Sequence, residues 1–208
     1  MDKLSSPRSP AEKRNLISSV FIGLLLALAY QEMVPPARES FRAEGLSAGL
    51  LILLLIFFLT TMRFFIGAIL HLVSDSLLSL GGGHWFIDFM VISLEMTLVI
   101  FMGGLTSVAA NREAKLDFFV LLVFLYAVDV LWIAGQSIAG KLRYSWRRPF
   151  IPSGWAYLNS ALIVGMVLIR LAFQDPFSSW AIVLLGMANV AAFVIDVILI
   201  DHYRVLRS

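Results

Sequence analysis

The sequence predicts an all-α fold, a polytopic transmembrane helical bundle of about six spans with both termini cytoplasmic. Three observations predict it. Of 208 residues, 60% are hydrophobic and only 14% are charged, six stretches are long and apolar enough to cross a bilayer, and basic residues gather in alternate connections. Soluble domains average about 45–50% apolar and about 25% charged residues. The composition therefore excludes a soluble globular domain.

The same composition excludes several classes of function. The chain has no cysteine, which rules out disulfide-stapled modules, thiolate metal sites and cysteine nucleophiles. Its net charge is +2 and no long basic tract is present, so we expect no nucleic-acid partner. The sequence contains no H-E-x-x-H, P-loop, G-x-S-x-G or EF-hand motif. We therefore expect no metal or other cofactor, and no catalytic set can be named.

A membrane-spanning helix needs about 20 mainly apolar residues. We predict a single transmembrane domain, residues 15–201, between an N-terminal segment 1–14 and a C-terminal tail 202–208. Six stretches of this domain are long and apolar enough to be spans: about 15–34, 46–73, 85–107, 117–138, 155–174 and 178–200.

The first two spans each leave an alternative open. Residues 9–12 read Ser-Pro-Ala-Glu, a capping box that favours a retained helix entering the first span, where Pro35 and Pro36 are expected to end it. The alternative is a cleaved signal peptide, because a basic segment and an apolar run precede Ala27-Leu28-Ala29. The second stretch is long enough to be tilted or to emerge at the interface, and the segment 76–83 after it is interfacial or re-entrant.

The distribution of lysine and arginine predicts the orientation. Ten of them lie on the side of the termini and four on the opposite side, which places both termini in the cytoplasm, in a bacterial inner membrane. Interfacial positions are expected for Trp85, Trp155 and Trp180. A basic group between the fourth and fifth spans sets the topology and is expected to hold anionic lipid headgroups: Lys141, Arg143, Arg147 and Arg148.

Polar residues recur inside five spans at helical spacing. Three pairs are seven residues apart, which is within about 20° of two full helical turns: Asp88 with Glu95, Asp129 with Gln136, and Asn189 with Asp196. Two further pairs share a helix face at spacings of eight and eleven: Arg63 with His71, and Asn159 with Arg170. Intramembrane ionisable groups are costly and usually face partners or a water-filled cavity. We therefore predict a polar core with all five stripes pointing inward.

Two interpretations of this polar core remain open. In the structural one, ion pairs fix helix register, with Arg63 pairing with Glu95 or Asp129 and Arg170 with Asp196. In the functional one, the excess of carboxylates leaves Glu95 and Asp129, near mid-span, poised to bind a proton or a cation. The sequence favours a small channel or transporter for a proton, cation or small polar solute. The alternatives are an intramembrane enzyme acting on a lipid or quinone, and a scaffold or effector subunit. A homo-oligomer or a subunit of a membrane complex is expected.

Overall fold

The computed structural model describes residues 10–73, 82–106, 112–143, 152–173, 175 and 177–205. Every regular element in these ranges is an α-helix: α1 (Pro10–Glu44), α2 (Ala48–Val73), α4 (Gly82–Gly104), α5 (Arg112–Arg143), α6 (Pro152–Ala172) and α7 (Ser179–Val205). All six are long and apolar enough to cross a membrane. The predicted all-helical class and the six candidate spans are thus confirmed. The segment 76–81, for which an interfacial or re-entrant course was expected, lies outside the described residues.

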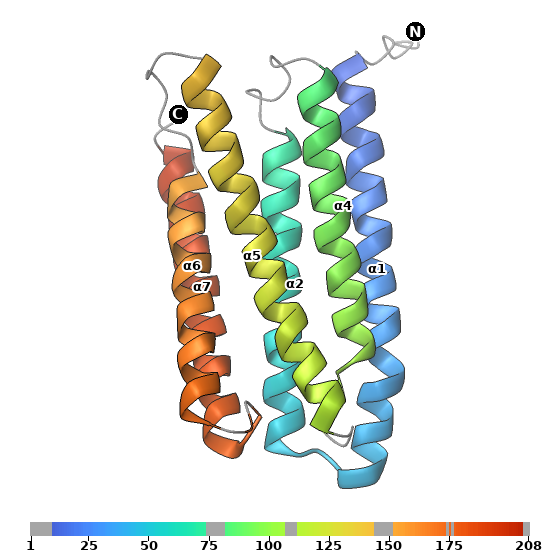
Figure 1. Cartoon of the computed structure of the whole chain (residues 1–208). Helices are drawn as coiled ribbons and strands as arrows, with labels where there is room; N and C mark the ends of the chain where they lie inside the picture. Colours follow the sequence, from blue (N-terminus) through green and yellow to red (C-terminus); the bar gives the residue numbers. More distant parts are fainter. Residues whose placement is uncertain are drawn as a thin grey trace, which may run out of the picture.

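Successive helices run in opposite directions, so the start of α1 and the end of α7 lie at the same end of the bundle (Figure 1). We call this the termini end, and the end that carries the turn from α1 to α2 the opposite end. Around the bundle the neighbours follow the order α1, α4, α5, α6, α7, α2 and back to α1, and α2 also contacts α4. Five helices therefore surround one interior, with α1 packed outside them against α4 and α2.

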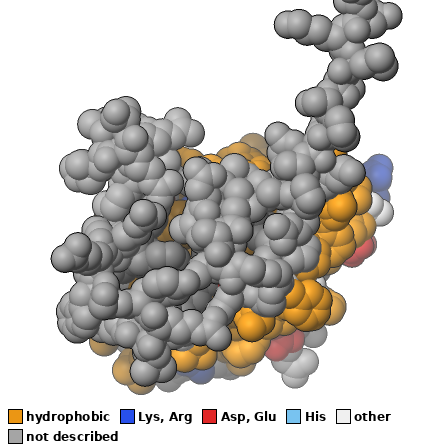
Figure 2. All heavy atoms as spheres, turned by 90° about the horizontal axis from the view of Figure 1, so that it is seen from above, with side chains coloured by type: hydrophobic (Ala, Val, Ile, Leu, Met, Phe, Trp, Pro, Cys, Tyr) orange, Lys and Arg blue, Asp and Glu red, His pale blue; other side chains and the backbone are white. Residues whose placement is uncertain are grey.

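The outer surface of the bundle is apolar. Many large hydrophobic side chains are more than half exposed, among them Leu24, Phe101, Leu131 and Leu171. Seen from the termini end, hydrophobic side chains cover much of the described rim (Figure 2). A water-soluble domain rarely exposes a continuous apolar surface of this extent. This distribution is that of a helical bundle whose outer faces meet lipid.

Helix α1 differs from its predicted span at the C-terminal end. It continues from Pro10 through Pro35 and Pro36 to Glu44, although the span was expected to stop at the prolines. The predicted capping box begins at Ser9, which lies outside the described residues. Proline has no backbone N–H, so Pro35 and Pro36 cannot donate the helical hydrogen bonds that the carbonyls of Gln31 and Glu32 would otherwise accept. Both residues are exposed, so polar surroundings near this end of the helix can satisfy the carbonyls.

The helix ends at Gly45, which adopts a left-handed conformation with φ of 72°. Its N–H donates to the carbonyl of Phe41 at 2.9 Å. Helix α2 then starts with a side-chain cap, because the backbone N–H of Leu50 donates to Ser47 Oγ at 3.2 Å. Gly45 and Gly49 form a small-xxx-small pattern in the sequence, but the role of Gly45 in the structure is to terminate helix α1.

Helices α1 and α4 approach each other most closely at Gly103. A Cβ atom at this position would lie 2.5 Å from the backbone carbonyl oxygen of Ala29. Backbone atoms cannot move aside cheaply, so this contact requires glycine. By contrast, a Cβ atom at Gly165 in α6 would meet nothing within 4 Å, so no close contact requires glycine at that position.

This difference predicts opposite effects of the same substitution. Gly103→Ala should lower the free energy of unfolding by about 1–3 kcal/mol, because the added methyl group overpacks the contact between α1 and α4. Gly165→Ala should leave it unchanged or raise it by about 0.5–1 kcal/mol, the usual gain of alanine over glycine within a helix. Denaturant unfolding of both variants in detergent micelles measures the difference. Equal stability of the two would contradict the close packing at Gly103.

Candidate functional site

The interior enclosed by α2, α4, α5, α6 and α7 holds a cluster of buried polar side chains. Each of the five helices contributes at least one member, and α1 contributes none. The members are Thr60, Arg63, Asp88, Glu95, Tyr126, Asp129, Asn159, Asn189 and Asp196, all less than 6% exposed. On each of these five helices, the polar residues named here therefore face the interior of the bundle, as the sequence predicted for the polar stripes.

Arg63 on α2 is the centre of the cluster. Its Nε forms an ion pair with Asp196 Oδ2 on α7. Its Nη2 donates to Asn159 Oδ1 on α6 at 2.9 Å, and its Nη1 donates to the hydroxyl of Tyr126 on α5 at 3.3 Å. The guanidinium carbon also lies 5.6 Å from the centroid of the Tyr126 ring, a cation–π distance. One side chain therefore joins four helices.

A second layer of hydrogen bonds completes this side of the cluster. Tyr126 donates its hydroxyl hydrogen to Asn189 Oδ1 at 2.8 Å, and Thr60 Oγ1 donates to the same oxygen at 3.1 Å. The amide nitrogen of Asn189 donates to the carbonyl of Leu185 one turn earlier, at 2.9 Å. Arg63, Tyr126, Asn189 and Thr60 therefore each have at least one hydrogen-bonded partner. We call this set, together with Asp196, the closed half of the cluster.

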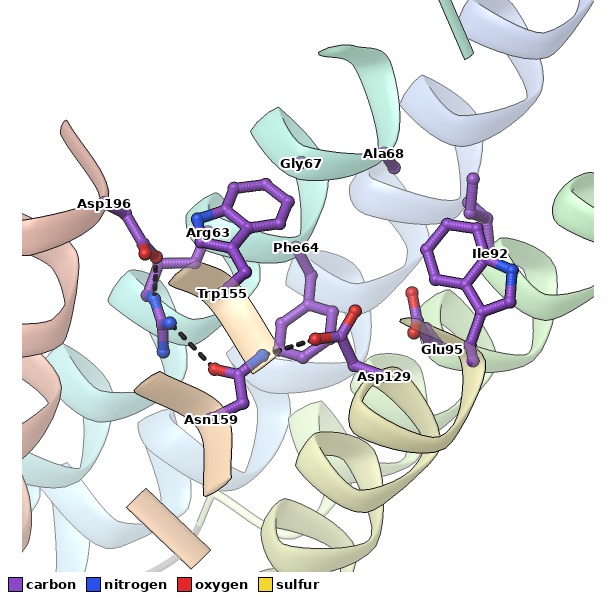
Figure 3. A pocket seen from close by; sticks show the side chains of 11 residues that line it. Arg63, Phe64, Gly67, Ala68, Ile92, Glu95, Asp129, Trp155, Asn159 and Asp196 are labelled. Atoms are coloured by element: carbon purple, nitrogen blue, oxygen red, sulfur yellow. Dashed lines mark hydrogen bonds and ion pairs between the residues drawn. The ribbon is translucent and has the colours of Figure 1, made fainter. Parts of the chain in front are cut away.

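The other half contains two carboxylates that face each other. Asn159 links the two halves, because its Nδ2 donates to Asp129 Oδ2 while its oxygen accepts from Arg63. Across from Asp129, the carboxylate of Glu95 on α4 points toward it (Figure 3). Glu95 is 2% exposed, and its Oε1 has no hydrogen-bond partner. We call Glu95 and Asp129 the carboxylate pair.

A cavity of about 20 Å³ lies against the carboxylate pair. A cavity needs roughly 10–15 Å³ to hold one water molecule, so this one has room for a single species of that size. Its wall includes Arg63, Asn159, Trp132 and Trp155. Trp155 fills the space above Gly67, where a Cβ atom would lie 2.2 Å from the indole ring (Figure 3). Trp155 therefore forms part of the site.

One more carboxylate lies closer to the termini end. Asp88 is buried seven residues before Glu95 on the same face of α4, and its Oδ1 accepts a hydrogen bond from the indole nitrogen of Trp132 at 3.1 Å. Two helical turns correspond to about 11 Å along the axis. Since Trp132 also lines the cavity, its side chain connects Asp88 with the surroundings of the carboxylate pair.

The charges of these buried groups do not balance. Among the residues that the structure describes, the buried charged side chains are one arginine and four carboxylates, Asp88, Glu95, Asp129 and Asp196. If all were ionised, three negative charges would remain. An uncompensated buried charge is expensive, and such a group takes up a proton or a cation instead. Because Arg63 forms its ion pair with Asp196, the imbalance falls on the carboxylate side of the cluster.

Toward the opposite end, the interior is apolar. Below Thr60, Tyr126 and Asn189, the buried side chains that the structure describes in α2 and α5 to α7 are all hydrophobic, and so are those of α4 between Glu95 and the end of the helix. The layer includes Phe57, Met102, Phe118, Leu122, Met166, Ile182 and Leu185. We call it the apolar layer. The polar groups therefore lie in the half of the bundle nearer the termini.

The predicted position of Arg170 was wrong. It was predicted to belong to the polar core and, in the structural interpretation, to pair with Asp196, but its side chain is exposed and Asp196 pairs with Arg63. Arg170 belongs to the last turn of α6, where a long basic side chain can reach the polar edge of a bilayer. Likewise, Arg63 does not pair directly with Glu95 or Asp129; Asn159 stands between Arg63 and Asp129.

Several predicted residues lie outside what the structure describes. Nothing is described of the side chains of His71, Gln136, Lys141 and Arg143, or of Arg147 and Arg148 at all. Other members of the site were not predicted, namely Thr60, Tyr126, Trp132 and Trp155. Each is three or four residues from a predicted polar residue on the same helix, a spacing that puts both on one face. That spacing was the signal that could have identified them.

The ion pair of Arg63 predicts a large loss of stability when it is broken. Arg63→Met leaves Asp196 buried without its cation, and removing one partner of a buried pair costs about 3–5 kcal/mol. Arg170→Met makes the same chemical change at an exposed position and should alter stability by less than about 0.5 kcal/mol. The double variant Arg63→Met with Asp196→Leu should recover most of the loss. Denaturant unfolding in detergent micelles gives all three values, and equal stability of the two single variants would contradict the pairing.

The assignment of a role to this site depends on its own geometry. Comparison of the chain with protein-family models, with curated proteins and with solved structures finds no match. No residue role is therefore carried over from another protein. The site itself offers two buried carboxylates, Glu95 and Asp129, that face each other beside a water-sized cavity. The amide of Asn159 connects them to the buried ion pair of Arg63 and Asp196.

Proposed function

We propose that the protein is a small membrane transporter that carries a proton or a small cation, bound at the carboxylate pair. The observation behind this proposal is the unpartnered Oε1 of Glu95, which is buried beside Asp129 and a cavity of about 20 Å³. Arg63 forms its ion pair with Asp196, so Glu95 is not needed to hold that guanidinium in place. Intramembrane carboxylates of this kind mark ion and proton pathways.

The size of the cavity favours small species. A polar solute larger than one water molecule does not fit into about 20 Å³. Of the three classes that the sequence suggested, the proton and the small cation therefore remain favoured over the small solute in this conformation. The alternative roles, an intramembrane enzyme and a scaffold, have no specific feature of the site in their favour.

The apolar layer favours a transporter over an open channel. A conducting pore needs polar groups or water along its whole length, and here one half of the bundle interior is hydrophobic. We propose that the bound species reaches the carboxylate pair from the termini end and that a conformational change opens the apolar layer. With the excess of basic residues on the side of the termini, this access side is the cytoplasm of a bacterial cell. A homo-oligomer and anionic lipid contacts at residues 141–148 belong to the same proposal.

The first prediction of this proposal concerns the carboxylates. Glu95→Gln and Asp129→Asn each keep the size of the side chain but remove its capacity to bind a proton or a cation. In liposomes containing a pH-sensitive dye, both variants should reduce gradient-driven flux to the level of liposomes without protein. Glu39→Gln, at an exposed position of α1, is the matched control and should retain the flux of the unmodified protein. Unchanged flux in both core variants would refute the transport proposal.

The second prediction concerns the apolar layer. Leu185 is fully buried within it, whereas its neighbour Leu184 is 45% exposed on the outside of the bundle. Leu185→Ser places a hydroxyl where water is otherwise excluded and should raise passive proton leak across liposomes several-fold. Leu184→Ser should leave the leak unchanged because its hydroxyl faces lipid. A pH gradient that decays equally slowly with both variants would show that the layer is not the barrier.

A further inference from the structure

We infer that the carboxylate pair binds a single proton, shared between Glu95 and Asp129, and that it is not a metal-cation site. This inference rests on the proposed function and names the species that the site takes. It depends on the juxtaposition of two buried carboxylates, on the orientation of Asn159 and on the composition of the cavity wall.

The wall offers too few oxygen ligands for a metal cation. Calcium ions take six to eight oxygens and magnesium ions need nearly ideal octahedral coordination, and alkali cations likewise exchange their hydration shell for a ring of protein oxygens. Of the three carboxylates in the cavity wall, Asp196 is paired with Arg63, which leaves Glu95 and Asp129. The wall residues Phe64, Ala68 and Ile92 are apolar. Among the described residues, no group of three or more His, Cys, Asp or Glu side chains could hold a metal ion.

The amide of Asn159 points its hydrogens, not its oxygen, toward the carboxylate pair. Its Oδ1 is occupied by the Nη2 hydrogen of Arg63, and its Nδ2 donates to Asp129. Turning the amide to offer oxygen to a cation would remove both hydrogen bonds at once. The volume of about 20 Å³ corresponds to one water-sized species, fewer than the several waters that a magnesium ion usually keeps.

A proton fits what the pair provides. Two carboxylates that face each other in a low-dielectric interior resist simultaneous ionisation and share one proton. The proton comes from water at the termini end and forms an O–H bond on Glu95. That hydroxyl donates to an oxygen of Asp129, which stays ionised because it accepts the hydrogen bond from Asn159. Release breaks the same O–H bond and returns the proton to water, so the site gains and loses one positive charge in each cycle.

Infrared difference spectroscopy of the full-length protein in liposomes tests this inference without relying on transport. A pH titration should reveal the carbonyl stretch of one protonated carboxylic acid that shifts in heavy water. The band should disappear in Glu95→Gln, change frequency in Glu95→Asp and Asp129→Asn, and persist in Glu39→Gln. Glu95→Asp keeps an acid at the position, so a folding defect of the glutamine variant does not decide the result. Calorimetric titration with sodium, potassium, magnesium and calcium chlorides should give no saturable binding.

The outcomes separate this inference from the proposed function. A titrating band that depends on Glu95, together with absent flux, would support the proton site and refute transport. Glu95-dependent flux without such a band, or saturable binding of one of the four cations that is lost in Glu95→Gln, would overturn the inference and leave transport standing. A band that persists unchanged in both Glu95→Gln and Asp129→Asn would also overturn it, because the proton would then reside on another group.

Discussion

A guanidinium group buried in an apolar bundle has to find acceptors for its hydrogens, and the relative arrangement of four helices follows from the acceptors that Arg63 uses. Its hydrogen bonds reach α5, α6 and α7, and its own helix is α2. Rotation or sliding of any of these helices would break the ion pair or one of these hydrogen bonds, and a buried polar group that loses its partner is costly. The hydrophobic surfaces allow many packings of these helices, and Arg63 selects one register.

The partners that Arg63 takes also determine which buried carboxylates are left without a direct ion pair to it. Arg63 uses its charge on Asp196 and reaches Asp129 only through the neutral amide of Asn159. The negative charge that is left over therefore collects on the side of α4 and α5, next to the cavity. The two parts of the cluster therefore differ: the closed half holds helices together through hydrogen bonds and an ion pair, whereas Glu95 in the carboxylate pair has an oxygen, Oε1, without a hydrogen-bond partner. Each half depends on the other through one asparagine side chain.

The sequence predicted the class of fold, the approximate spans and most of the polar core, because hydropathy and helical periodicity are local properties. It did not predict which partner Arg63 takes, since pairing depends on the rotation and depth of helices that are distant in sequence. Arg170 shows the same limit, because its spacing from Asn159 did not reveal that it is exposed in the last turn of α6. Helix α1 can continue through Pro35 and Pro36 because the carbonyls of Gln31 and Glu32, which lose their helical hydrogen bonds, belong to exposed residues. A local sequence pattern does not contain this information about exposure.

The contact between Trp155 and Gly67 has a consequence for the evolution of this protein. The indole occupies the volume that any side chain at position 67 would need, so these positions are free to vary only as a pair. Descendants of the same ancestor should keep glycine opposite tryptophan, or exchange both for residues of complementary volume. Combined with an arginine four residues before the glycine and an asparagine four residues after the tryptophan, this pair forms a signature spread over two helices. It can identify distant relatives where overall sequence similarity has faded.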